Sequence, residues 1–180
     1  MENFWQVCAA LDNPRRLRMV NVLTVNEPRS VCELAEFHDI GVSLISRYIR
    51  ALDDVGLLAV EWKDRKAYYR TAPRNQTAAR ILRVLSEFFS VFAEDGERIA
   101  KLLKYIHALS HPRRFAIVRF VHNHPGVSVA EISRELGIAR SSVDRLLGEL
   151  DHAYIVDMNN HAIPPTVEPE RSFFDLSVSN

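Results

Sequence analysis

The stretch Val31–Leu58, VCELAEFHDIGVSLISRYIRALDDVGLL, decides how the rest of the chain is interpreted. A short apolar-periodic segment is followed by a tight turn, a longer periodic segment and the start of a strand. This order predicts a helix-turn-helix that leads into a β wing. The same pattern recurs 98 residues later as Val129–Val156, VAEISRELGIARSSVDRLLGELDHAYIV. A chain that carries a DNA-reading motif twice is most simply a transcriptional regulator.

The duplication extends beyond the two motifs. Between Ala10–Asp53 and Ala108–Asp151, 14 of 44 positions are identical without a gap, which is more than chance gives. We therefore expect a mainly α fold with small β wings, in which two tandem winged helix-turn-helix domains are joined by a long helix. The expected divisions are a first winged-helix domain over residues 1–75, a linking helix over 76–96 and a second winged-helix domain over 97–180.

The composition is that of an ordinary globular protein. The chain has 23 basic and 23 acidic residues, so the total charge neither supports nor excludes nucleic acid as a partner. No apolar run approaches the roughly 20 residues that span a membrane, and the N-terminus lacks the pattern of a secretory signal. Two cysteines do not make a disulfide framework. We expect a cytoplasmic protein without a membrane partner.

The second helix of the motif, from about Ser43 to Val55, carries the candidate DNA-reading face. Ile45, Ile49 and Leu52 recur at helical spacing and predict its buried side. Polar and basic side chains remain for the outside, where an arginine can bind both acceptors of a guanine edge. The candidate contacts are Ser43, Leu44, Ser46, Arg47 and Arg50. The alternative is an amphipathic helix whose polar side faces water.

Two further basic groups lie near this helix. Asn13 and Pro14 predict the start of an earlier helix, and Arg15, Arg16 and Arg18 follow as either a solvated face or phosphate contacts. Apolar residues bracket the polar segment Glu61–Lys66, which predicts a hairpin. Lys63, Arg65 and Lys66 at its tip are candidate backbone or minor-groove contacts, although a charged tip can also serve solubility alone.

Four stretches carry a family resemblance: ALDNPRRLRMVNVL, SVCELAEF, SLISRYIRALDDVGLL and KDRKAYYR. Together they resemble the ArsR family of winged-helix repressors over residues from about 4 to 92, and the second copy covers most of the rest. The resemblance implies a dimeric bacterial or archaeal repressor that leaves DNA when an effector binds. MarR-type regulators are the neighbouring possibility.

The second repeat keeps only part of the reading face. Arg140, Ser141, Ser142 and Arg145 remain as candidate DNA contacts, but Asp144 replaces Ser46 and Gly148 replaces Arg50. Its wing is expected from strands at Tyr154–Asp157 and Ser172–Leu176 around the proline-rich, acid-containing loop Met158–Arg171. Such a loop is a poor phosphate contact. We expect the first repeat to bind DNA more strongly.

The segment Thr77–Phe92 predicts a helix that packs on two sides, because its apolar residues exceed one stripe. In the family that the chain resembles, the helix after the wing builds the dimer interface, and internal packing is the alternative. The candidate interface residues are Ile81, Leu85, Phe88, Phe89 and Phe92. We expect no equivalent helix after the second wing. The chain then forms either an intramolecular pseudo-dimer or a homodimer that presents four DNA-recognition helices.

No constellation of residues predicts catalysis, a cofactor or a metal site. Cys8 and Cys32 fall short of the two or three closely placed thiolates that soft metals need, and His122 and His124 match no zinc spacing. Phosphate-cradling glycine loops and nucleophile elbows are missing from the sequence. The main hypothesis is thus a regulator that binds double-stranded DNA and responds to an unknown effector, and the resemblance implies that it is a repressor. The alternative is a winged-helix scaffold that binds other proteins.

Overall fold

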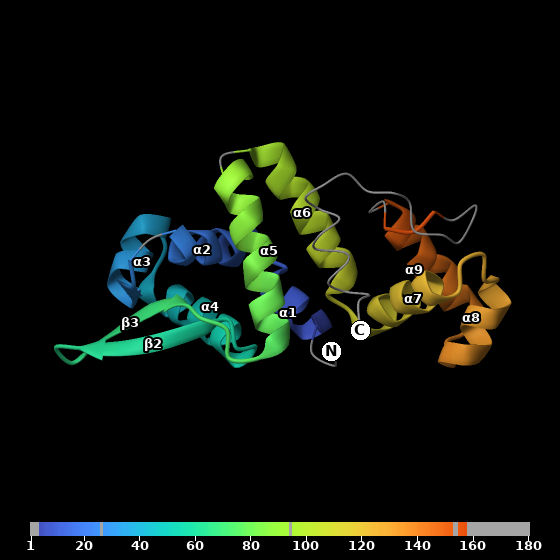
Figure 1. The fold of residues 1–180 in the computed structure, drawn as a ribbon, viewed down its shortest axis with the longest axis horizontal. Helices are drawn as coiled ribbons and strands as arrows, with labels where there is room; N and C mark the ends of the chain where they lie inside the picture. The colour runs from blue at the N-terminus through green and yellow to red at the C-terminus, as the bar shows by residue number, and fades with distance from the viewer. Residues whose placement is uncertain (1–3, 26, 94, 153–154, 158–180) are drawn as a thin grey trace.

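A computed structural model describes residues 4–25, 27–93, 95–152 and 155–157. In the first repeat the elements are α1 (Phe4–Leu11), α2 (Pro14–Val25), β1 (Arg29–Ser30), α3 (Val31–His38), α4 (Val42–Asp54), β2 (Leu58–Lys63) and β3 (Lys66–Thr71). The long helix α5 (Gln76–Phe92) follows. The second repeat comprises α6 (Gly96–Leu109), α7 (Pro112–Asn123), α8 (Val129–Leu136) and α9 (Arg140–His152). Figure 1 shows the two helix-turn-helix units at opposite ends, with α1, α5 and α6 between them.

The helices of the two repeats have matching bounds. Helices α7, α8 and α9 each begin and end 98 residues after α2, α3 and α4. The hydroxyl of Ser30 accepts from the backbone of Glu33 while the Glu33 carboxylate binds back, and Ser128 and Glu131 repeat this capping box. After each of these helices, Asp39 and Gly137 take the left-handed conformation that a tight turn needs. The two predicted helix-turn-helix units and the tight turn in each are confirmed.

The wing is a three-stranded antiparallel sheet in the order β1-β3-β2. Its hairpin was predicted, but the strands are longer than expected, because a two-residue turn at Asp64 and Arg65 replaces the six-residue segment Glu61–Lys66 as the connection. The third strand, β1, was not predicted. It pairs Arg29 with Tyr69 and Ser30 with Tyr68, and two residues are too few to carry a period-2 signal.

Helix α5 is buried on more than one side, as its apolar residues predicted. Asn75 caps it by accepting from the backbone of Ala78 at 2.8 Å. The candidate interface residues Ile81, Leu85, Phe88 and Phe89 are at most 3% exposed within the single chain, and Phe92 is half-buried against the same core. These side chains are therefore occupied by internal packing, and a dimer interface on α5 stays a prediction.

The two repeats share one continuous hydrophobic core, which runs from Phe4 to Val156. Helix α1 packs on α6, its counterpart in the second repeat. The ring of Phe4 stacks on that of Phe115 with centroids 5.4 Å apart. Beside them the Ser110 hydroxyl donates to the Asp12 carboxylate at 3.1 Å, and these two residues occupy equivalent positions in the repeats. The equivalent first helices thus meet across a common contact.

The predicted second wing lies almost entirely outside the described residues. Of its first strand, Ile155 and Val156 are buried and Asp157 forms a bridge. The predicted loop Met158–Arg171 and the strand Ser172–Leu176 are not among the residues that the structure describes. Within the described residues, no helix has the length and apolar character that crossing a bilayer requires.

Candidate nucleic-acid interface

Helix α4 has one buried side and one basic side, as its periodicity predicted. Ile45, Ile49 and Leu52 are buried in the core, which leaves Ser43, Arg47 and Arg50 exposed. Two candidate contacts are less accessible than expected, because Leu44 and Ser46 are half-buried. The Ser46 hydroxyl donates to the backbone carbonyl of Val42 at 2.9 Å. Its oxygen lone pairs remain free to accept a hydrogen bond from another group.

The C-terminal end of α4 is fixed to the start of α5. The Arg74 guanidinium lies 2.9 Å from the Asp53 carboxylate, and the Asn75 amide donates to the Val55 carbonyl at 3.2 Å. Gly56, two residues after the end of α4, has a φ of +78°. A Cβ at this position would lie 2.6 Å from the side-chain amide nitrogen of Asn75. The adjacent carboxylates Asp53 and Asp54 thus lie at a helix end, with Asp53 in a structural contact.

The exposed arginines of α4 have no acidic partner within the described residues. No carboxylate of the residues that the structure describes comes within ion-pair distance of Arg47 or Arg50. Four residues after Arg47, where an acid would reach its guanidinium along the helix, the chain has Ala51. Both side chains can therefore meet an external anion or a base edge without first breaking an ion pair.

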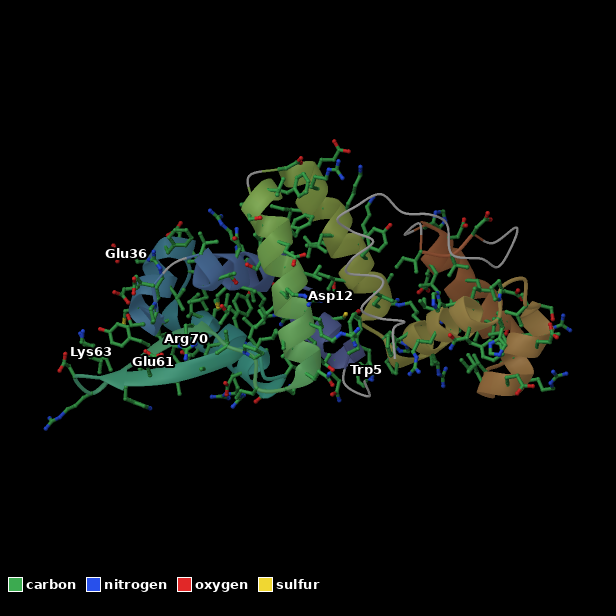
Figure 2. The ribbon with its side chains drawn as sticks, viewed as in Figure 1. Trp5, Asp12, Glu36, Glu61, Lys63 and Arg70 are labelled. Carbon is green, nitrogen blue, oxygen red and sulfur yellow. The ribbon has the colours of Figure 1, made fainter. Side chains whose placement is uncertain are left out.

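The wing tip adds a second group of exposed bases. Lys63, Arg65 and Lys66 are exposed, and Figure 2 shows Lys63 towards the far end of the hairpin. The carboxylate of Glu61 lies 2.5 Å from the guanidinium of Arg70, so this acid is paired within the hairpin. Arg65 has φ +64°, a conformation that costs an L residue roughly 1–2 kcal/mol compared with glycine.

The side chain of Trp62 belongs to this surface but was not among the predicted contacts. It is 73% exposed, next to Lys63 on β2, and Val60 two residues earlier is also exposed. The alternation Val60-Glu61-Trp62 is visible in the sequence, but it does not say which face of the strand meets the core. An exposed tryptophan beside lysine and arginine offers a flat apolar surface next to positive charge.

Arg16 forms internal contacts, whereas the sequence predicted either a solvated side chain or a phosphate contact. Its guanidinium donates to the Ala9 carbonyl at 3.0 Å and lies over the Tyr48 ring, 5.9 Å from the centroid. Its counterpart Arg114 donates to the carbonyl of His107 at 2.7 Å. The arginine therefore joins the first helix of each repeat to the second. Arg15 and Arg18 are exposed, and Arg18 lies over the ring of Phe37.

The reading face of the second repeat is internally paired. Arg140, Ser141 and Arg145 are exposed and Ser142 is half-buried, so most of the candidate side chains are accessible. However, Glu149 forms an ion pair with Arg145 on the same helix and a second one with Arg114 at 2.9 Å. Hydrogen bonding from Arg114 and the charge of Arg145 hold the pKa of Glu149 below its usual value. The carboxylate stays ionised and keeps Arg145 engaged.

The two cysteines lie in different environments. Cys8 is fully buried in the core, where burial raises the pKa of its thiol well above the usual value, while Cys32 is exposed at the start of α3. Among the residues that the structure describes, no three His, Cys, Asp or Glu side chains are grouped as a metal site.

Comparison with protein families identified both repeats. Residues 13–60 match the description "Bacterial regulatory protein, arsR family", and residues 113–155 match "IclR helix-turn-helix domain". Searches of curated proteins and of solved structures gave no significant match. The chain is thus a tandem helix-turn-helix protein that resembles the ArsR family in its first repeat, and such domains are those of DNA-binding transcription regulators.

Proposed function

We propose that the protein is a sequence-specific DNA-binding repressor that reads DNA mainly through α4 and the basic wing of the first repeat. One observation carries the proposal: Arg47 and Arg50 are exposed side by side on one helix face without acidic partners in the described part of the chain. Each arginine that binds a guanine edge contributes roughly 1–3 kcal/mol of discrimination.

The wing supports the same assignment. Lys63, Arg65 and Lys66 provide phosphate contacts that are independent of sequence, and Trp62 can pack on the sugar edge beside them. The turn keeps an arginine in a left-handed conformation where glycine would be unstrained. Strain of this kind is often found at functional positions, so the charge of Arg65 has a role at the tip.

In this proposal the second repeat acts mainly by packing on the first repeat and contributes little to DNA binding. Contact between equivalent first helices, and between Asp12 and Ser110, supports an intramolecular pseudo-dimer. Repeat two then fixes the orientation of repeat one and adds only a weak second contact to DNA. Arg140 and Ser141 are exposed on that face.

Titration of duplex fragments from the gene's own neighbourhood tests the proposal. Wild-type protein is expected to bind one fragment preferentially, with affinity that falls steeply as salt rises. The double variant Arg47→Ala, Arg50→Ala should lose at least about thirtyfold in affinity, because two base contacts of roughly 1–3 kcal/mol each are removed. The charge-matched control Arg83→Ala, Lys101→Ala removes two exposed bases from α5 and α6 and should change affinity little. Equal losses in the two double variants would contradict the assignment of α4.

The protein-binding scaffold remains the second candidate, and the pairing of Arg145 with Glu149 is the observation that favours it. A winged helix whose exposed arginine is paired with an acid binds the DNA phosphates only weakly. If wild-type protein binds no fragment at low salt, the scaffold becomes the better description.

A further inference from the structure

A pocket of about 570 Å³ lies along α6, where the two repeats meet. Small-molecule sites in proteins have volumes of roughly 300–1,000 Å³. The first repeat contributes Asp12 and Pro14 to its lining, and Figure 2 shows Asp12 near the centre of the molecule. The second repeat contributes Arg114 from α7 and Glu149 and His152 from α9. The pocket therefore touches the helix pair of repeat two and the start of α2.

The walls of the pocket are mostly apolar. Ala100, Leu103 and Ala108 lie on one face of α6, and Pro14 closes the side of the first repeat. Two of these side chains are single methyl groups, which leaves room beside the helix. A ligand body that fills this space is therefore apolar and of the size of one or two fused rings.

Of the Lys and Arg side chains in the lining, Arg114 is paired with Glu149, and Lys104 has no ion pair with a described residue. Asp12 accepts from Ser110 and lies 2.9 Å from the ring nitrogen of His107. Glu149 is engaged by Arg114 and Arg145. Lys104, which also lines the pocket, has no ion-pair partner in the described ranges. An apolar pocket that presents a free ammonium group favours an anionic ligand head.

We propose that this pocket binds a small organic acid, with its apolar body against α6 and its carboxylate held by Lys104. His152, at the end of α9, is the second donor to the carboxylate. The proposed ligand site is independent of the DNA-binding proposal, because its residues lie neither on α4 nor on the wing.

Calorimetric titration of the full chain with 2-naphthoate, 4-phenylbutyrate and octanoate tests the site, with 2-naphthamide as the uncharged match. At least one acid should bind with a Kd below about 1 mM, and the amide at least tenfold more weakly. Lys104→Gln should weaken the acid by about tenfold. Lys101→Gln, one turn earlier on α6 and outside the pocket, should leave its Kd unchanged.

Three results would overturn the proposal. The first is that none of the acids binds at about 1 mM. The second is equal binding of naphthoate and naphthamide, or equal Kd values for the Lys104→Gln and Lys101→Gln variants. The third is a carbodiimide crosslink, mapped by mass spectrometry, between Lys104 and Glu168, Glu170 or Asp175, since the chain's own acids would then hold the ammonium group.

Discussion

Helices α4 and α9 occupy the same place in the two repeats, have the same length and follow the same capped helix and left-handed turn. Their outer faces differ at a few positions. Arg47 faces Ala51 one turn on, whereas Arg145 faces Glu149, and Arg50 is replaced by Gly148. If α4 reads DNA as proposed, the same backbone in α9 does not by itself provide a surface for reading DNA. The difference lies in whether an acidic side chain pairs with the exposed arginine.

Transplanting the acid into the first repeat should have the largest effect. In an Ala51→Glu variant the new carboxylate lies four residues after Arg47. By equivalence with the Glu149–Arg114 pair we also expect it near Arg16, whose Nε has no hydrogen-bond partner among the described residues. The protein should stay folded and lose DNA affinity by about thirtyfold to a hundredfold, because Arg47 is paired and phosphates are repelled. Ala51→Gln is the uncharged control. A DNA titration that gave equal losses for the two variants would assign the effect to shape and not to charge.

Relieving the strain at the wing tip should separate stability from affinity. Arg65→Gly removes the cost of a left-handed arginine, so the free energy of unfolding in urea should stay the same or rise by less than about 1 kcal/mol. DNA affinity should nevertheless fall by about fivefold, because one phosphate contact is lost. Asp64→Gly relieves a similar conformation and keeps the base, so its affinity should not fall. Parallel losses in both variants would mean that the tip's shape matters and not its charge.

Making the second repeat resemble the first should strengthen DNA binding, by less than the losses predicted above. Glu149→Ala restores the residue of the equivalent position in repeat one, Ala51, and frees Arg145. The slope of log K against log salt should become steeper by about 0.9, the value for one added phosphate contact. Glu135→Ala breaks an exposed ion pair with Arg134 on α8 and serves as the control. An unchanged slope in Glu149→Ala would place the second repeat away from DNA altogether.

The two capping boxes should contribute alike to stability, so we expect the smallest difference between the repeats here. Ser30→Ala and Ser128→Ala should each lower the free energy of unfolding, by about 1 kcal/mol for Ser30. Hydrogen bonds from the serines hold the pKa of Glu33 and that of Glu131 below the usual value. The part of each cap that the carboxylate provides is therefore fully present above the unfolded pKa of about 4.5, and it is lost as pH falls through the lower folded pKa. Urea unfolding between pH 3 and 7 measures both. A loss confined to one variant would show that the repeats differ in construction as well as in charge.

Local patterns were enough to predict much of the fold. The offset of 98 residues and the tight turn of each motif are properties of short segments, and the helix bounds and the left-handed turn residues agree with both. Strand β1 escaped because its two residues form a strand only by pairing with Tyr68 and Tyr69, far along the chain. The shared core and the contact between α1 and α6 likewise depend on tertiary packing, which no local period encodes.

The candidate interface was predicted less completely than the fold. Residue type and spacing placed Arg47, Arg50 and the wing bases on the outside, and they are exposed. They could not reveal that Arg16 is held by a backbone carbonyl, that Trp62 is exposed, or that Glu149 bridges two arginines. The bridge needs Arg114 from a helix 35 residues earlier, so only the fold brings the three side chains together.

The most direct test is to compare Arg47→Ala with Arg145→Ala on the same preferred duplex at one salt concentration. The two variants lose the same side chain at equivalent positions, so intrinsic differences between substitutions cancel. We predict that Arg47→Ala lowers affinity by about tenfold to a hundredfold and Arg145→Ala by less than about threefold. A loss for Arg145→Ala as large as that for Arg47→Ala would contradict the claim that the first repeat is the reader.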